Sequence, residues 1–106
     1  MEGTRSFYGN VLLEEKELKE REERNPIELM YYKTKKCRNN LMNQKYDIYG
    51  IEILKKEYIG KEIHMESECV ENISKNETIV DRIIEKLKNN SVTPMSLKEI
   101  MHDILY

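Results

Sequence analysis

The chain has few of the residues from which specialised sites are built. Its 106 residues include no Trp, one Phe, two Pro, four Gly and two Cys. Two cysteines without a CxxC pair do not support a disulfide framework. The soft or imidazole ligands are Cys37, Cys69, His64 and His102, and no two of them have the spacing of a zinc site. We therefore expect no metal and no cofactor.

Long apolar runs are also missing. No stretch approaches the roughly 18 apolar residues that a membrane-spanning helix needs. Met1 is followed by charged and polar residues rather than by a secretion signal. We expect a cytoplasmic protein without a membrane partner.

Motifs of catalysis are absent from the sequence as well. It contains no GxSxG, P-loop or GxGxxG motif. None of its twenty carboxylates falls inside an apolar stripe, where burial would shift the pKa. Glu52 comes nearest, but strand alternation puts it on the opposite face from Ile51 and Ile53. We expect a protein that is not an enzyme and has no small-molecule substrate.

The chain does have a high fraction of charged residues and a modest fraction of apolar ones. Hydrophobic residues make up 39% and charged residues 36%, with a net charge of −2. A chain of this length buries roughly 65% of its unfolded surface, which suffices for a single domain over residues 1–106. The positive charge is concentrated in a basic segment, residues 33–45, that holds no acid: Lys33, Lys35, Lys36, Arg38 and Lys45.

The first quarter of the chain gives weak structural signals. Residues 1–10, rich in Gly, Ser and Asn, are typical of a loose leader. Residues 11–24 begin with three apolar side chains and continue as an almost wholly charged run, which fits a solvated helix or an edge strand. Asn25-Pro26 ends that element, because Pro fixes its own φ and restricts the residue before it.

Residues 27–73 alternate with the period of antiparallel strands. Ile27 to Thr34 is the first strand, and Cys37 to Lys45 is a polar loop. Tyr46 to Ile59 is the second strand, and Gly60 supplies the turn that follows it. The return strand has one apolar face, which we expect to lie in the core: Ile63, Met65, Cys69 and Ile73.

From Ser74 the period changes to that of amphipathic helices. The first helix is capped by Ser74 with Glu77, or by Asn76, and its apolar stripe is Ile79, Val80, Ile83, Ile84 and Leu87. A second helix opens at Thr93-Pro94 or one turn later at Ser96, with the stripe Leu97, Ile100, Met101, Ile104 and Leu105. We predict an α+β fold in which this two-helix unit, residues 77–105, covers one face of a three- or four-stranded antiparallel meander.

Two binding functions remain. Seven tyrosines exceed what the predicted sheet face can bury, and tyrosine is favoured at interfaces. A meander also leaves an edge strand that can pair with a second copy or with a partner peptide, and Ile27 to Thr34 is a candidate for that edge. We expect a non-enzymatic interaction or regulatory module that self-associates or binds a protein partner.

The alternative is a nucleic-acid-binding regulator. The basic segment is flanked by tyrosines, which would combine phosphate contacts with base stacking. The candidate interaction residues are Tyr31, Tyr32, Lys33, Lys35, Lys36, Arg38 and Tyr46.

Three stretches of the second half resemble a family of small uncharacterised proteins from clostridia and their relatives. They are Tyr49-Gly50-Ile51-Glu52-Ile53, Val70-Glu71-Asn72-Ile73, and Val92 to Leu97 with the terminal Asp103-Ile104-Leu105. The similarity covers about residues 46–106, and Val11 to Leu18 is similar to the family's N-terminal strand. The charged run 14–24 and the basic segment depart from the family. Since the family is a domain of unknown function, the resemblance implies a bacterial cytoplasmic origin and a compact α+β module, with no activity or site residues.

Overall fold

The computed structural model describes residues 3–13 and 25–105, which form four strands and two helices. The strands are β1 (Thr4–Leu13), β2 (Ile27–Asn39), β3 (Lys45–Ile59) and β4 (Glu62–Ser74). The helices are α2 (Glu77–Asn89) and α3 (Pro94–Leu105). The strands pair antiparallel in the order β1-β2-β3-β4, so the predicted α+β meander is confirmed and has four strands.

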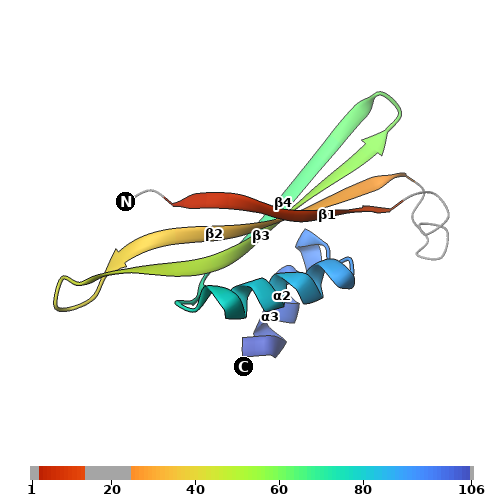
Figure 1. Cartoon of the computed structure of the whole chain (residues 1–106). Coiled ribbons are helices and arrows are strands. Elements are labelled where there is room, and N and C mark those ends of the chain that lie inside the picture. The colour runs from red at the N-terminus through yellow and green to blue at the C-terminus, as the bar shows by residue number, and fades with distance from the viewer. Residues whose placement is uncertain (1–2, 14–24, 106) are drawn as a thin grey trace.

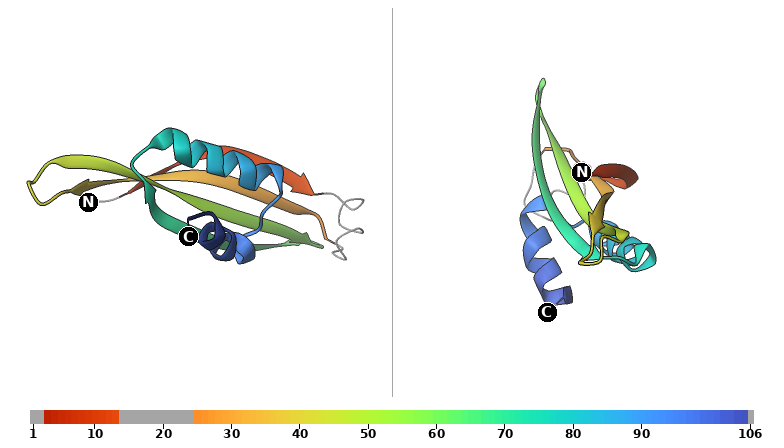
Figure 2. Two further views of the ribbon diagram at one scale, coloured as in Figure 1. Left: turned by 90° about the horizontal axis from the view of Figure 1, so that it is seen from below. Right: turned by 90° about the vertical axis from the view of Figure 1, so that its left-hand side faces the viewer.

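Both helices lie on one side of the sheet. Figure 1 shows α2 and α3 below the strands, and in the view from below they lie in front of them (Figure 2, left). The strands twist strongly, and the β3–β4 hairpin diverges from the β1–β2 pair (Figure 1). The molecule is therefore elongated, with principal extents of 53 × 28 × 18 Å.

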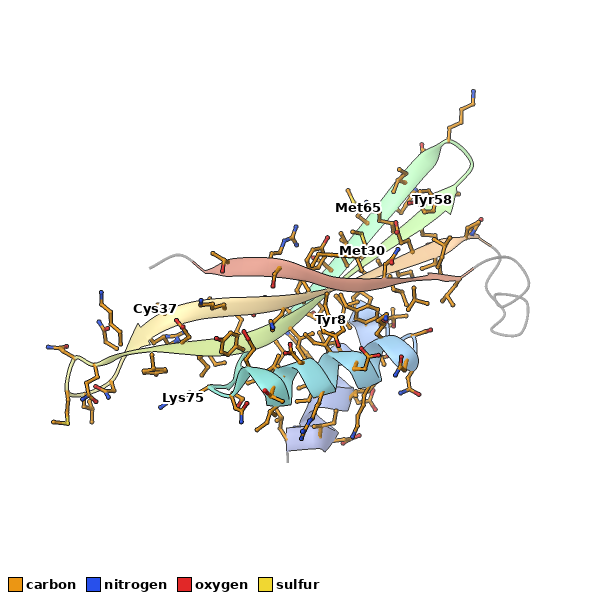
Figure 3. The ribbon with its side chains drawn as sticks, viewed as in Figure 1. Tyr8, Met30, Cys37, Tyr58, Met65 and Lys75 are labelled. Atoms are coloured by element: carbon orange, nitrogen blue, oxygen red, sulfur yellow. The ribbon has the colours of Figure 1, made fainter. Side chains whose placement is uncertain are left out.

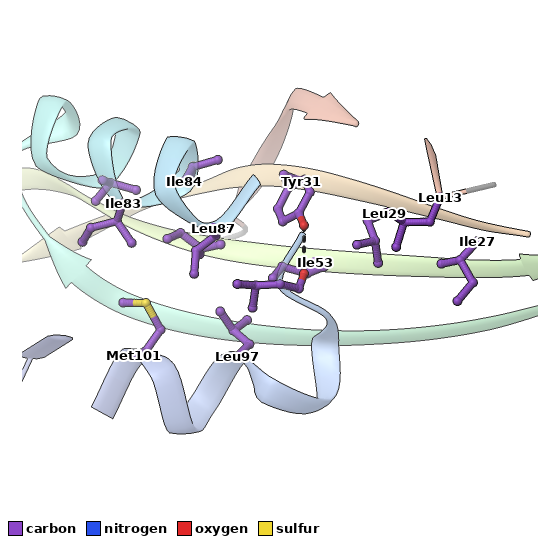
Figure 4. Close-up of a cluster of buried hydrophobic side chains, with 13 residues drawn as sticks. Leu13, Ile27, Leu29, Tyr31, Ile53, Ile83, Ile84, Leu87, Leu97 and Met101 are labelled. Carbon is purple, nitrogen blue, oxygen red and sulfur yellow. Dashed lines mark hydrogen bonds between the residues drawn. The ribbon is translucent and has the colours of Figure 1, made fainter. Parts of the chain in front are cut away.

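The core fills the space between the covered face of the sheet and the two helices (Figure 4). The strands contribute Leu29 and Ile53 with no exposed surface, and the helices contribute Ile84 and Leu97, also fully buried. Tyr31 lies at the centre, where its hydroxyl donates a hydrogen bond to the carbonyl oxygen of Val92 at 2.8 Å. This bond joins β2 to the connection between α2 and α3.

The helix ends resolve the alternatives left by the sequence. Asn76 caps α2, because its side-chain oxygen accepts a hydrogen bond from the backbone N–H of Thr78 at 3.0 Å. The second helix begins at Pro94 rather than one turn later. The predicted stripes are confirmed in part: Val80, Ile83, Ile84, Leu87, Leu97 and Met101 are buried, whereas Ile79, Ile104 and Leu105 are exposed.

The prediction of a loose leader over residues 1–10 was wrong for the described part. Thr4–Leu13 is an edge strand that pairs with β2 from Thr4 opposite Lys35 to Leu13 opposite Ile27. Turn-forming residues are tolerated there because the strand is at an edge and contains a bulge between Phe7 and Gly9. The rest of the predicted 11–24 element lies outside the described residues.

Tyr8, in the bulge of β1, connects this strand to the helical layer. Its hydroxyl donates a hydrogen bond to Oε2 of Glu85 on α2 at 2.7 Å. Figure 3 shows Tyr8 on the helix side of the sheet. Tertiary contact, which a local sequence window does not contain, therefore holds β1 in place.

The loop between β2 and β3 is shorter than the predicted Cys37 to Lys45. Strand β2 continues to Asn39 and β3 starts at Lys45, so the turn is residues 40–44. The predicted turn at Gly60 is confirmed, and Gly60 has a φ of +60°. Strand β2 lies between β1 and β3, so Ile27 to Thr34 is not an edge. The two edges are β1 and β4.

The predicted core face of the return strand was wrong for Ile63, Met65 and Cys69 and right for Ile73. The two-residue turn after Ile59 pairs Ile59 with Glu62, which sets Ile63 opposite Tyr58 and Met65 opposite Lys56. Because one step of register exchanges the two faces, this pairing turns Ile63 and Met65 away from the helices. They are 54% and 65% exposed. Cys69, opposite Glu52, shares that face, whereas Ile73 packs against the core.

Ile73 returns to the core because β4 carries a bulge opposite Gly50. Residues 71–73 of β4 lie between the pairs Ile51–Val70 and Tyr49–Ser74. Asn72 within the bulge has a φ of 57°, in the left-handed region. A Cβ at Gly50 would stand 2.5 Å from the carbonyl oxygen of Val70. The missing side chain thus permits the close approach at which β4 bends toward α2.

Replacing Gly50 should therefore destabilise the protein strongly. The change Gly50→Ala places a methyl group against the backbone of Val70 and Glu71, and overpacking of this kind costs about 2–3 kcal/mol. The control is Gly9→Ala, whose Cβ meets only the flexible side chain of Lys88 at 3.1 Å. Urea unfolding should show a clearly lower free energy of unfolding for Gly50→Ala alone. Equal losses in the two variants would refute a special role for Gly50.

The hydroxyl of Tyr31 gives a second test of the core. The change Tyr31→Phe removes the bond to Val92 and leaves a buried carbonyl oxygen without that donor, which costs about 1–2 kcal/mol. Tyr32→Phe is the matched control, since the Tyr32 hydroxyl donates to the sulfur of Met30 at 3.9 Å, which is a weak acceptor. Thermal unfolding of the two variants should differ. A Tyr31→Phe protein as stable as the control would contradict this role.

Candidate interaction surface

Tyr31, one of the predicted interaction residues, is not available for binding. It has no exposed surface and its hydroxyl bonds to Val92. The prediction was wrong here because the odd-numbered residues of β2 face the helices, which strand alternation alone did not reveal. Tyr31 is a core residue.

Lys33 lies on the same helix-covered face as Tyr31. Its Nζ is 2.8 Å from Oδ1 of Asp81 and 3.4 Å from Oε2 of Glu77, both on α2. Burial acts to lower the pKa of Lys33, but the two carboxylates outweigh it and raise that pKa above its usual value. Lys33 therefore connects the sheet to α2 and stays charged in doing so.

The next cations of the basic segment also have partners within the chain. Lys36 contacts Glu71 at 2.5 Å, and Lys35 lies 3.7 Å from Asp47. Arg38 donates a hydrogen bond to the side-chain oxygen of Asn72 at 3.2 Å, a neutral partner. The acids come from β3, β4 and α2, so folding compensates charge that appeared unopposed in the sequence.

The remaining tyrosines are spread over the molecule. Tyr46 lies near the β2–β3 turn, with Nζ of Lys75 4.3 Å from its ring centroid. Tyr32 is on the side of the sheet away from the helices, where its ring meets Phe7 edge-on at 5.7 Å and the Arg5 guanidinium at 4.3 Å. The predicted residues thus do not form one site. Tyr31 and Lys33 lie on the helix-covered face, Tyr32 and Lys36 lie on the opposite face, and Arg38 and Tyr46 lie near the β2–β3 turn.

Several exposed apolar side chains lie on the sheet side opposite the helices, called here the open face. Figure 3 shows Met30, Tyr58 and Met65 on that side. Phe7, Leu12, Ile63 and Met65 are each more than half exposed. By the strand register, the apolar side chains of the open face include Phe7, Leu12, Met30, Tyr32, Ile48, Leu54, Tyr58, Ile63 and Met65.

Of these open-face residues, sequence reasoning proposed only Tyr32 as an interaction residue. The sequence feature that could have revealed this surface is that β2 and β3 have apolar residues at both odd and even positions. Met30 and Tyr32 stand between core residues of β2, and Leu54 follows the core residue Ile53 in β3. Strands covered on one face only are expected to alternate with polar residues. Apolar side chains at both parities therefore point to a second surface.

Charged side chains of both signs lie among the apolar ones. Nη1 of Arg5 contacts Oε1 of Glu52 at 2.6 Å, and hydrogen bonding to this carboxylate raises the pKa of Arg5. Glu28 accepts hydrogen bonds from Asn10 at 2.9 Å and from the Tyr58 hydroxyl at 3.3 Å. Lys56 lies opposite Glu28 in the strand register. Over the apolar part of the open face, the acids Glu28 and Glu52 therefore balance the bases Arg5 and Lys56, and Lys36 at its end is paired with Glu71.

A hollow of about 430 Å³ lies at one end of the open face, lined by Arg5, Thr34, Lys36, Glu52 and Cys69 among others. Burial raises the pKa of the Cys69 thiol, and the nearby carboxylates of Glu71 and Glu52 act in the same direction. Cys69 is therefore held as a thiol, whereas a cysteine nucleophile needs the thiolate.

The candidate metal ligands give no cluster in the part of the chain that is described. Over residues 3–13 and 25–105, no three His, Cys, Asp or Glu side chains come together as a metal site. Cys37 and Cys69 are both free thiols. His64 lies 3.2 Å from Glu62 on the β3–β4 hairpin.

Comparison with known proteins places the chain in a family. The model of a family of unknown function, DUF6514, matches residues 10–106. The chain belongs to this family. The DUF6514 match starts within β1 and runs through the basic segment, which was expected to depart from the family. No curated protein and no solved structure matched the chain.

Helices long and apolar enough to cross a membrane do not occur among the described residues of this DUF6514 chain. The longer described helix, α2, has 13 residues and carries charges on its outer side. Its inner side belongs to the core.

Tyr8 provides a pH test of the contact between β1 and α2. Hydrogen bonding to Glu85, with burial and the charge of that carboxylate, raises the pKa of Tyr8 to about 12 from 10.0. A raised pKa means that the bond stabilises the fold fully below pH 10 and is lost as the pH rises to about 12. The stability difference between the unmodified protein and Tyr8→Phe should be constant below pH 10 and shrink above it. A difference that does not change with pH in urea unfolding would refute this.

Proposed function

We propose that this protein is a non-catalytic interaction module that self-associates, with the open faces of two copies packed against each other. The observation that carries the proposal is the apolar surface of the open face, where Phe7, Leu12, Ile63 and Met65 are 54%, 55%, 54% and 65% exposed. Large apolar side chains that are exposed together on one face mark protein interfaces. Two packed sheets about 10 Å apart would bury it.

The charges on the open face favour a second copy over a strongly charged partner. Arg5 and Lys56 balance Glu28 and Glu52, and Arg5 and Glu52 already form an ion pair. A face without excess charge does not attract an acidic or basic ligand, whereas it can meet its own two-fold image without net repulsion.

The size of the open face is sufficient for a specific dimer. Four strands about 4.8 Å apart, paired over about eight residues of about 3.3 Å each, give roughly 500 Å². Two such faces bury about 1,000 Å², the lower limit for a specific interface. The aromatic rings of Phe7, Tyr32 and Tyr58 would supply much of the apolar contact.

The strand edges offer a second mode of self-association. Strand β1 is exposed along most of its length, and an unpaired strand edge can hydrogen-bond to another chain. Edge pairing depends on backbone N–H groups, which a proline removes, while face packing depends on side chains. The two modes therefore separate by mutation.

Nucleic-acid binding is the competing function, and the ion pairs count against it. Lys33, Lys35 and Lys36 have acidic partners, so phosphate binding would require these contacts to break. A nucleic-acid complex would lose affinity steeply with salt. An apolar dimer would survive the same salt.

The dimer is tested by sedimentation equilibrium with matched double variants. Leu12→Glu with Met65→Glu puts carboxylates into the open face, and should weaken dimerisation at least tenfold, or about 1.4 kcal/mol. The control, Met95→Glu with Ile104→Glu, changes exposed side chains of α3 in the same way and should leave the dimer intact.

Three outcomes count against the open face. A monomer at about 1 mM would exclude any self-association stronger than about 4 kcal/mol. A dimer that both double variants preserve, but that a proline within Thr4–Leu13 disrupts, would assign the interface to the β1 edge. A dimer that the α3 control disrupts would assign it to the helical side.

A further inference from the structure

The turn between β2 and β3, residues 40–44, is called here the hairpin tip, and its conformation is fixed by one side chain. The side-chain oxygen of Asn40 accepts hydrogen bonds from the backbone N–H groups of Met42 and Gln44, both at 2.9 Å. Its Nδ2 donates to Oε1 of Gln44 at 3.0 Å. Asn43 takes a φ of 59°, and its N–H donates to the Asn40 carbonyl at 3.0 Å. The tip is thus a well-bonded turn.

This turn directs two apolar side chains into solvent. Leu41 is 106% exposed and Met42 is 79% exposed, and they are adjacent. Figure 1 places the β2–β3 hairpin at one end of the elongated molecule, beyond the helices. The fold buries none of Leu41 and little of Met42, so neither side chain belongs to the core.

Positive charge gathers at the same end of the molecule. Arg38 pairs across the hairpin with Tyr46, Lys45 pairs with Asn39, and Lys75 lies over the Tyr46 ring. Among the described residues, no acidic side chain lies within ion-pair distance of Arg38, Lys45 or Lys75. Further along the strands, Lys33, Lys35 and Lys36 are compensated. Uncompensated cations therefore surround the base of the apolar tip.

We propose that the hairpin tip docks on an anionic lipid surface. Leu41 and Met42 enter the boundary between headgroups and acyl chains, and Arg38, Lys45 and Lys75 contact the headgroup phosphates. The Tyr46 ring lies at the level of the headgroups, where amphipathic aromatic side chains are favoured. We predicted no membrane partner from the sequence because it has no apolar run long enough for a membrane-spanning helix. Docking on the surface of a bilayer does not need such a helix.

The chemistry of the tip favours lipid over other partners. A nucleic acid would accept the cations but would leave two aliphatic side chains unburied. A second copy would bring like charges together at this end, unlike at the balanced open face. An anionic bilayer accepts both features at once. Since two apolar side chains bury less than an acyl chain, the binding is reversible and no stronger than that of a single myristoyl group, about 10⁴ M⁻¹.

The test is flotation of the full-length protein with vesicles of phosphatidylcholine, with or without phosphatidylserine. The unmodified protein should bind only the vesicles that contain phosphatidylserine. Leu41→Ser with Met42→Ser should lower the partition coefficient at least tenfold, and so should Arg38→Gln with Lys45→Gln. Met95→Ser is the matched control, because Met95 is 83% exposed but lies on α3, and it should bind as the unmodified protein does.

Several results would overturn the proposal. Absence of binding at a high phosphatidylserine content would do so directly. If Leu41→Ser with Met42→Ser left vesicle binding unchanged, the binding would be charge attraction alone and the proposed insertion would be wrong. Equal loss in Met95→Ser would remove the specific role of the tip. A last outcome would assign the tip to nucleic acid: the protein binds DNA and no vesicles. In that case Arg38→Gln with Lys45→Gln would abolish DNA binding, whereas Leu41→Ser with Met42→Ser would leave it unchanged. Circular dichroism checks that each variant folds.

Discussion

The architecture depends on the close approach of β4 to β3 at Gly50. At this point the carbonyl oxygen of Val70 occupies space that any side chain would fill. The approach allows the bulge at residues 71–73, and the bulge turns β4 toward the start of α2. Helix α2 then lies over the inner face of the sheet, where Val80, Ile83, Ile84 and Leu87 are buried. The close backbone approach thus lies directly before the helical layer.

The helices cover one face of the sheet and leave the open face exposed. The helices satisfy the apolar side chains of the inner face, and ion pairs such as Lys33 with Asp81 attach the helical layer to the sheet. The same pairs remove most of the charge that made the basic segment attractive as a binding site. Two surfaces keep apolar side chains exposed to solvent. On the open face the charges are balanced, whereas at the hairpin tip positive charge is in excess. These two surfaces differ in charge, and we assign them to different partners for that reason.

The candidate site was less predictable than the fold because its residues are distributed over all four strands. Phe7, Tyr32 and Met65 come together only through strand pairing, and their distance in sequence hides the surface they share. Tyr31 and Tyr32 are neighbours of the same type, yet one is in the core and the other on the open face. Odd and even residues of a strand point to opposite faces, and the helices decide which of the two faces is buried. The sequence of the strand alone does not specify that choice.

The sequence by itself determined the two amphipathic helices, the turn at Gly60, the start of a strand after Pro26 and the antiparallel meander, because each follows from local periodicity or from the backbone limits of Gly and Pro. Tertiary structure decided the rest. It made a strand of Thr4–Leu13, which is held by its partner β2 and by the bond from Tyr8 to α2 rather than by its own propensities. It set the face of Ile63 and Met65 through the register of one turn, because a shift of a single residue exchanges the two sides of a strand.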